Sequence, residues 1–334
     1  MEILAFLFLV AAGVGLAAIA AQHLVLWTHV RQAPPVPRRT PPVSILKPLC
    51  GIDDGLEGNL ASFASIEYPE YEVVLGVRDA RDAAYPAALS AAARWPGRFR
   101  VALQRGEPGM NPKVNQLATL ARAARHDVLV VSDSNVRVGP GYLSEIAALL
   151  EDEAVGLVTH PIAGVGEASV GSLMDHLHLA GSITPGIVGA KRLAGRDFVV
   201  GKSMALRRAD LDALGGFEAV KDVLAEDWVL GVMVPSALGK RVAVARWSSA
   251  MQTTVPFRNR LAVEILRFEG PVGGTVVLKA RYALFGPDGR KVISAGESIV
   301  REPTGGADYE ALTAAMSRAL AAFSREVAEA IPAR

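Results

Sequence analysis

The chain has 334 residues, of which 51% are hydrophobic and 21% are charged, and this balance excludes a globally disordered protein. It carries 35 Lys and Arg and 34 Asp and Glu, a formal net charge of +1, so it lacks the surplus of cations on which nucleic-acid binding depends. Its single cysteine, Cys50, excludes an internal disulfide, and no Cys/His cluster has the spacing of a zinc site.

An uncharged apolar run begins at Ile3 and continues, interrupted only by Gln22 and His23, to residue 27. About 20 apolar residues at ~1.5 Å rise span a hydrocarbon core of ~30 Å, so the run predicts a transmembrane helix over residues 3–27. A signal peptide and a buried core helix are the alternatives. The basic n-region of a signal peptide is missing, because Glu2 is the only charge before the run.

Basic residues follow this run at Arg31, Arg38 and Arg39. By the positive-inside rule they predict a single-pass protein of the inner (cytoplasmic) membrane, with everything after Arg31 in the cytoplasm. Residues 28–42 are rich in proline, which favours an extended linker between the membrane and the rest of the chain.

Short β-type runs then alternate with alanine-rich helical stretches, and we assign residues 43–257 to one α/β domain. Alternation at this spacing predicts βαβ units and a mostly parallel sheet. Ligands of such sheets bind beyond the carboxyl ends of the strands. The expected strands cover residues 43–46, 71–77, 100–103 and 127–131, and the expected helices cover residues 82–94 and 113–125.

The pattern changes near residue 261, and residues 262–332 predict a small antiparallel α+β unit. Residues 287–290 read as a hairpin turn, and Asp308 as the cap of a final helix over residues 308–331. The expected strands cover residues 263–268, 275–285 and 291–301, and the apolar stripe of the helix is expected at Leu312, Met316, Leu320, Phe323, Val327 and Ile331.

Three acidic positions could carry chemistry. Asp79 follows an expected strand and could accept hydrogen bonds from a nucleotide, or could cap the next helix. Asp133 and Asn135 follow another strand and offer hard oxygen ligands to a divalent metal, or form an Asx-turn. Glu226 and Asp227 precede an apolar run and could supply a general base, or simply cap a helix.

The order of these positions, an Asp, then Asp-x-Asn, then Glu-Asp after Gly-Gly-Phe, resembles inverting glycosyltransferases of the GT-A type. More closely, the chain resembles glycosyltransferase family 21, the ceramide glucosyltransferases and their bacterial hopanoid-modifying relatives, over about residues 1–257. The resemblance rests on residues 42–51, 59–63, 68–72, 111–115, 132–138 and 215–217, in that order.

This resemblance implies transfer of a sugar, with glucose expected, from a UDP-sugar to the hydroxyl of a membrane lipid such as ceramide or a hopanoid. It implies that Asp79, Lys113 and Asp133 bind the nucleotide sugar, and that Asp133 with Asn135 holds a divalent metal, Mg²⁺ or Mn²⁺. By the same resemblance Asp227 is the general base of an inverting attack. A solvated helix charge remains an alternative for Lys113, and Glu226 reads as a neighbour that modulates Asp227.

The chain departs from the family after residue 257. The family's Gln/Arg-x-x-Arg-Trp motif and its later hydrophobic segments have no counterpart there, and Trp247 is the last tryptophan. Residues 276–284 and 308–312 instead resemble the C-terminal half of auxiliary lipoproteins of ABC-type transport systems that move lipids. We therefore expect impaired turnover. A non-enzymatic accessory of ABC-type lipid transport and an inactive hybrid of the two families are the alternatives.

Overall fold

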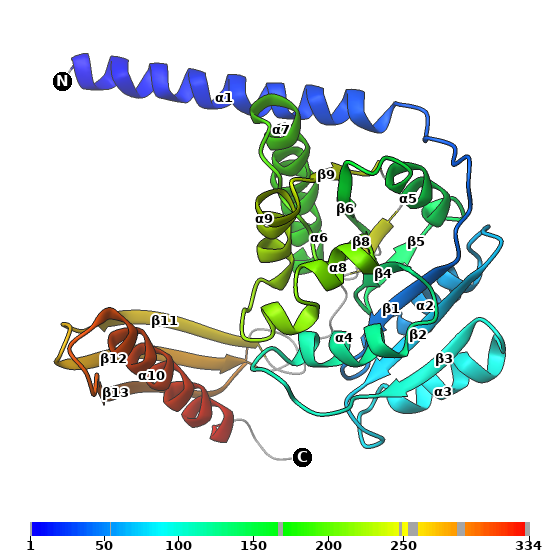
Figure 1. Cartoon of the computed structure of the whole chain (residues 1–334). Coiled ribbons are helices and arrows are strands. Elements are labelled where there is room, and N and C mark those ends of the chain that lie inside the picture. The colour runs from blue at the N-terminus through cyan, green and yellow to red at the C-terminus, as the bar shows by residue number, and fades with distance from the viewer. Residues whose placement is uncertain are drawn as a thin grey trace. The chain divides into compact units, whose positions relative to one another are not determined.

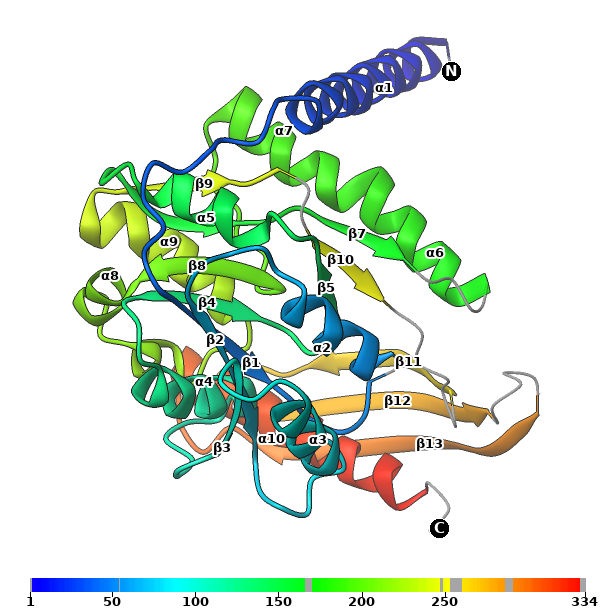
Figure 2. The same ribbon diagram turned by 90° about the vertical axis from the view of Figure 1, so that its right-hand side faces the viewer.

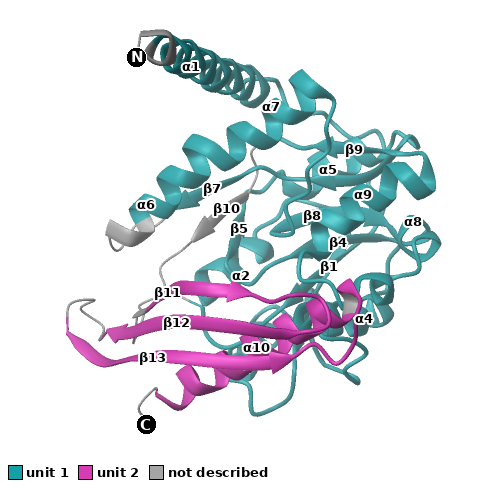
Figure 3. Ribbon diagram, turned by 90° about the vertical axis from the view of Figure 1, so that its left-hand side faces the viewer, with its two compact units in different colours: residues 1–254 teal, residues 255–334 magenta. Residues whose placement is uncertain are grey.

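The computed structural model describes residues 2–53, 55–165, 170–246, 249–252, 260–285 and 291–330. The chain divides into two compact units, Met1–Thr254 and Val255–Arg334, which Figure 3 distinguishes by colour. The first unit contains the N-terminal helix and the sheet on which the strand-end carboxylates lie. The second is the small α+β unit expected from the sequence.

Helix α1 (Glu2–Val30) confirms the expected N-terminal apolar helix. Among the described residues it is the one helix long and apolar enough to cross a membrane, over Phe6–Val30. It packs against α7 (Thr184–Ala194) (Figures 1 and 2). At this contact Gly189 leaves room for the side chain of Gln22. Near its end, His29 Nε2 lies 3.0 Å from the carbonyl oxygen of Ala245, so α1 is attached to the body of the unit.

The proline-rich segment after α1 runs over the surface of the first unit and is held there. The backbone N–H groups of Arg38 and Arg39 both donate to Glu151 Oε1. Farther along, the Tyr68 hydroxyl donates to the carbonyl oxygen of Pro41 at 2.8 Å. The segment is therefore extended, as its prolines predict, but it is fixed to the domain rather than free in solvent.

The main sheet has seven strands in the order β3-β2-β1-β4-β8-β6-β9. All neighbouring pairs are parallel except β4 with β8 and β6 with β8, so the expected mostly parallel sheet is confirmed. The strands are β1 (Val43–Pro48), β2 (Tyr71–Val77), β3 (Phe99–Leu103), β4 (Val128–Ser132), β6 (Val155–Thr159), β8 (Ser203–Arg207) and β9 (Arg241–Val244).

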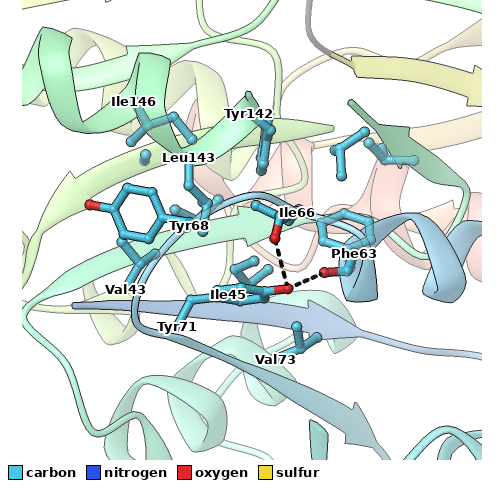
Figure 4. Close-up of a cluster of buried hydrophobic side chains, with 14 of the residues drawn as sticks. Val43, Ile45, Phe63, Ile66, Tyr68, Tyr71, Val73, Tyr142, Leu143 and Ile146 are labelled. Carbon is cyan, nitrogen blue, oxygen red and sulfur yellow. Dashed lines mark hydrogen bonds between the residues drawn. The ribbon is translucent and has the colours of Figure 1, made fainter. Parts of the chain in front are cut away.

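Helices cover both faces of this sheet, because the side chains of each strand alternate between two hydrophobic cores. Figure 4 shows one core, in which the buried Tyr71 hydroxyl donates to the carbonyl oxygen of Phe63 at 2.9 Å. This core involves α2 (Leu56–Ala64), α3 (Tyr85–Arg94) and α5 (Tyr142–Leu150). The other involves α4 (Pro112–Ala123), α8 (Arg208–Ala213), the 3₁₀ turn η2 (Phe217–Val220) and α9 (Glu226–Leu238).

Two differences from the expected helices have local causes. Helix α3 begins at Tyr85 rather than at residue 82, because Asp82 Oδ1 accepts the N–H groups of Gly51 and Ala84, both at 2.9 Å, and so closes a turn. Helix α4 begins at Pro112, since the preceding Asn111 caps it.

A small second sheet of β5 (Val136–Val138), β10 (Ser249–Gln252) and β7 (Ile162–Val165) lies in the same unit. A long helix follows β7. It consists of α6 (Val170–His178), a π-helical segment η1 (Leu179–Ile183) and α7, without interruption. Stretches of π-helix are rare and often mark functional sites.

The second unit is an antiparallel sheet with one helix, as expected. Strands β11 (Arg260–Glu269), β12 (Thr275–Phe285) and β13 (Val292–Pro303) pack against α10 (Tyr309–Glu329), and Asp308 caps α10 by accepting the Ala311 N–H at 2.7 Å. The expected apolar stripe is wrong at Leu320, which is 46% exposed, whereas Ala315 and Ala319 are buried. The expected turn at 287–290 and Ile331 lie outside the described residues.

Candidate active site

A cavity of about 480 Å³ lies at the edge of the main sheet where β4 ends and β8 begins. Its lining combines a polar, charged part, here called the polar side, with an apolar part, here called the apolar side. The polar side comprises Asn111, Lys113, Asp133, Lys202, Glu226 and Asp227. The apolar side includes Ile162, Leu179, Ile183, Ile187 and Leu224. Three of the residues predicted from the sequence, Lys113, Asp133 and Asp227, thus come together here.

Lys113 is placed by the cap of α4. The side-chain oxygen of Asn111 accepts the N–H groups of Lys113 and Val114 at 3.0 and 3.3 Å, and this fixes the first turn of the helix. The amide nitrogen of Asn111 donates to Val223 O at 2.7 Å and to Glu226 Oε2 at 3.2 Å. One capping residue therefore joins the start of α4 to the start of α9.

The ammonium group of Lys113 lies between two carboxylates. Its Nζ is 3.0 Å from Asp133 Oδ1 and 2.8 Å from Glu226 Oε1, and it donates to the Gly201 carbonyl oxygen at 3.3 Å. Burial disfavours the charged form of Lys113, but the two carboxylates outweigh burial and raise its pKa. Lys113 is therefore a fixed cation of the site and not the solvated helix charge that was the alternative.

Asp133 directly follows β4 and is surrounded by lysines. Lys113 lies at Oδ1, Lys202 Nζ lies 3.0 Å from Oδ2, and Lys47 Nζ donates to the Asp133 carbonyl oxygen at 2.6 Å. Burial alone would raise the pKa of Asp133, but the ammonium groups of Lys113 and Lys202 hold it below its ordinary value. The carboxylate is thus kept ionised. Asn135 lies close by, with its Oδ1 accepting from Lys202 at 3.4 Å.

Asp227 lies in the first turn of α9, where the N–H groups of the helix end favour negative charge. Its Oδ1 accepts the N–H of Trp228 at 2.8 Å, and its Oδ2 accepts the N–H of Gly201 at 2.6 Å. Its neighbour Glu226 is buried and paired with Lys113, so the two carboxylates have different surroundings. Asp227 is half-buried, and among the described residues it forms no ion pair with a lysine.

Asp79 lies elsewhere on the same sheet edge. It follows β2 by two residues, and β1 separates β2 from β4. Its Oδ1 accepts the Arg81 N–H at 2.7 Å, its Oδ2 pairs with Arg81 at 3.3 Å, and this exposed pairing lowers the pKa of Asp79. It is not part of the cavity lining. Binding of the nucleotide by Asp79 stays a prediction.

The sequence predicts no role for three polar lining residues, Asn111, Gly201 and Lys202, or for Lys47, which contacts Asp133 from outside the cavity lining. Lys47 is fully buried, with its ammonium 4.0 Å from the centre of the Phe63 ring, and burial lowers its pKa to about 7. Gly201 and Lys202 precede β8 and meet Asp227, Lys113 and Asp133 directly.

The residues present fit a divalent metal only as part of a site shared with a diphosphate. Among the described residues no group of three or more His, Cys, Asp and Glu side chains forms a metal cage. The charged lining has two ammonium groups and three carboxylates, a negative excess of one. Mg²⁺ is commonly held by one or two carboxylates together with substrate phosphates, and Asp133 with Asn135 matches that pattern.

A larger cavity of about 920 Å³ lies at the opposite edge of the sheet, where β4 begins and β8 ends. Two of the four arginines in its lining are paired within the protein: Arg207 with Asp210 at 3.1 Å and Arg208 with Asp127 at 3.6 Å. None of the site residues predicted from the sequence lines it. We therefore place the candidate active site in the smaller cavity.

Comparison with known proteins agrees with the resemblance found in the sequence. Residues 7–262 match the family described as Glycosyl transferase family 21, and residues 232–328 match the ABC-type transport auxiliary lipoprotein component. Ceramide glucosyltransferase 1 of Caenorhabditis elegans is 29% identical over 250 residues, 72% of this chain and 50% of that protein. Ceramide glucosyltransferase of Komagataella phaffii is 29% identical over 205 residues, 54% of this chain and 40% of that protein. The chain thus spans about half the length of these relatives or less.

Solved structures with a similar fold include a mannosyltransferase from Pyrobaculum calidifontis in complex with GDP-Man and Mn²⁺, at 22% identity and a TM-score of 0.49. The alignment covers 74% of this chain and 68% of that one. The TarS 1–349 structure of S. aureus in complex with UDP-GlcNAc aligns at 15% identity with a TM-score of 0.43, over 64% of this chain and 59% of that one.

Proposed function

Because the chain belongs to glycosyl transferase family 21, we propose that it is a glycosyltransferase that moves a sugar from a UDP-sugar to a membrane lipid hydroxyl. We propose glucose as the sugar and ceramide or a hopanoid-like lipid as the acceptor. The names of the curated relatives support glucose and ceramide. The observation that carries the proposal is the pairing of Lys113 with both Asp133 and Glu226 beside Asp227 in one cavity.

The polar side of the cavity supports donor binding. Lys113 and Lys202 supply positive charge where a departing diphosphate gains negative charge. We propose that Asp133 and Asn135 hold a divalent metal, which when bound would offset the charge on the diphosphate. Asp79, at the end of β2, would contact the nucleotide.

The proposed base is Asp227. The lipid oxygen attacks the anomeric carbon as its proton passes to a carboxylate oxygen of Asp227, and the bond from that carbon to the UDP oxygen breaks. Attack opposite the leaving group inverts the configuration, and the electron pair of the broken bond leaves with UDP. Glu226 is held in an ion pair with Lys113, whereas Asp227 accepts a backbone N–H from Gly201. Asp227 is therefore the better placed of the two carboxylates to accept a proton.

The apolar side of the cavity supports a lipid acceptor. Leu179, Ile183 and Ile187 line it from successive turns of the helix that α7 completes, and Leu224, 93% exposed, lies at its rim. Because α7 also packs against α1, the wall of the cavity is joined to the helix proposed to cross the membrane.

We propose that α1 anchors the chain in the inner membrane with the catalytic domain, residues 43–257, on the cytoplasmic side. The three arginines that follow α1 support this orientation. A tag at the C-terminus should resist external protease in spheroplasts with a sealed inner membrane. Digestion of the tag in these spheroplasts would contradict the proposed orientation.

Turnover with a lipid extract tests the proposal. The full chain in detergent is incubated with UDP-glucose or UDP-N-acetylglucosamine, a divalent metal and lipid, and the mass of the product is measured. A product heavier than the acceptor lipid by one sugar residue is expected. Absence of any such product, together with absence of UDP binding, would overturn the proposed function.

The match over residues 232–328 favours a second candidate for the C-terminal unit, an accessory role in ABC-type transport. Its own core of sheet and α10 is consistent with a separate domain. Replacing residues after 257 with the corresponding segment of a ceramide glucosyltransferase distinguishes the two candidates. If the unit stands in place of a missing catalytic element, the exchange should raise sugar transfer about 100-fold without changing UDP affinity, a gain of about 2.7 kcal/mol in transition-state stabilisation.

A further inference from the structure

Lys202 has no role assigned by the motifs of the sequence, yet it lines the cavity of the candidate site. Its backbone oxygen accepts the Asp133 N–H at 3.2 Å, and the next residue, Ser203, donates its N–H to Val200 O at 3.2 Å. Val200 in turn donates its N–H to Thr159 Oγ1 at 2.9 Å. The backbone that carries Lys202 is therefore held by β4 on one side and β6 on the other, which fixes where its side chain begins.

The two lysines that line the cavity differ in how fully their donors are used. An ammonium group has three N–H donors. Those of Lys113 meet three acceptors, on Asp133, Glu226 and Gly201. Those of Lys202 meet two among the residues that the structure describes, Asp133 Oδ2 at 3.0 Å and Asn135 Oδ1 at 3.4 Å, and its side chain is 35% exposed. Lys202 is thus the cation with donor capacity left for a ligand.

We propose that Lys202 binds the diphosphate of the nucleotide-sugar donor, and that in the absence of donor it neutralises Asp133. The proposal rests on the proposed function, since it names a binding residue of the same site. Its chemistry is specific: a phosphate oxygen is a charged acceptor, and hydrogen bonds to charged groups are about twice as strong as neutral ones. An ammonium that leaves Asp133 for a phosphate also frees a carboxylate oxygen for a divalent metal.

Binding of inorganic pyrophosphate and of UDP to the full chain in detergent tests the role, measured by calorimetry with Mg²⁺ and again with EDTA. Lys202→Met should weaken both ligands by about 10-fold or more, the loss of a hydrogen bond to a charged group. Lys202→Arg, which keeps the charge, should bind close to the parent. Lys279→Met is the matched control, because Lys279 is equally exposed, at 36%, and paired with Glu297 on the sheet of the second unit.

The outcomes separate the two proposals. A parent that binds neither pyrophosphate nor UDP overturns the proposed function and this inference with it. A parent that binds both ligands, with a Lys202→Met variant that binds them equally well, overturns the role of Lys202 alone. So does a loss that is seen with Mg²⁺ but vanishes in EDTA, since Lys202 would then act only through the metal. Lys202→Gln supplies the same comparison if the Met variant does not fold.

Discussion

The backbone N–H of Gly201 donates to Asp227 Oδ2 at 2.6 Å, and a Cβ at residue 201 would lie 2.7 Å from that same oxygen. A methyl group there would also meet the Cβ and Cγ atoms of Asp227 at 3.0 Å. The carboxylate and the glycine therefore fit only because residue 201 has no side chain. The position of Asp227 therefore depends both on the hydrogen bond from Gly201 and on the space that this glycine leaves.

Gly201→Ala should accordingly lower turnover while UDP binding remains. The added methyl group must displace Asp227, and misplacement of a reacting group by ~1 Å costs about 100-fold in rate. Steady-state kinetics and UDP calorimetry on the same preparation would measure both. Gly186→Ala, on α7, is the control, because a Cβ at Gly186 meets no atom within 4 Å. Equal turnover of the two variants would contradict the contact described here.

Asp227→Asn keeps the shape of the side chain but removes proton acceptance. Loss of a general base lowers the rate by about 10²–10⁴-fold. UDP affinity should stay near that of the parent, since the proposed role belongs to the acceptor side. Asp152→Asn, on the exposed pair with Arg241, is the control for loss of one carboxylate. Normal turnover of Asp227→Asn would remove Asp227 from the mechanism.

Asp133→Ala and Asp79→Ala should weaken UDP binding in different ways. Asp133 lies between two cavity lysines, so its loss should abolish the increase in affinity that a divalent metal gives. Asp79 lies outside the cavity, so its loss should weaken UDP equally with metal and with EDTA. Titrations of UDP under both conditions distinguish these patterns. If both variants bind UDP as the parent does, both assignments are wrong.

His160 predicts a pH dependence of stability. The ring is fully buried, stacks near Tyr142 with ring centres 4.9 Å apart, and its Nδ1 lies 2.9 Å from Ser203 Oγ. Burial lowers its pKa from 6.5 to about 3. The unfolded chain therefore takes up a proton near pH 6.5 that the folded chain refuses, so stability is lost as the pH falls from 6.5 towards 3.

Between pH 6.5 and about 4.5 this term should lower the unfolding free energy by roughly 2 kcal/mol. Thermal unfolding in detergent should show a smaller fall in Tm across that range for His160→Gln than for the parent. His178→Gln, at an exposed position, should behave like the parent. A parent whose Tm is constant over this range would contradict the burial argument.

The charged side of the site was only partly predictable from the sequence. Asp133 follows a strand whose β-type run is visible in the residues, and carboxyl ends of parallel strands gather ligands. The rule that ligands gather at the carboxyl ends of strands did not predict Lys202. Strand β8 runs antiparallel to β4, so the start of β8, and not its end, lies beside Asp133. The direction of one strand depends on long-range pairing that local sequence does not specify.

The final helix shows a second limit. Helical spacing of large apolar residues located α10, its cap at Asp308 and most of the face that packs, where Phe323 and Val327 are buried. Ala315 and Ala319 are fully buried, because close approach of the helix to the sheet favours small side chains at the contact. Leu320 extends away from this contact. Periodicity of large apolar residues therefore identified the helix and most of its buried face, but not the alanines at the closest contact.

Helix α7 contacts both the candidate cavity and α1. Ile187 lines the cavity, and Gly189, two residues farther, lies against Gln22 of α1. With α1 in the membrane, as proposed, the distance of the cavity from the bilayer is set by side-chain packing between α7 and α1 and not by the length of a linker. A fixed distance of this kind would select acceptors by position: hydroxyl groups at one height above the membrane would reach the cavity, and those that lie deeper or farther out would not.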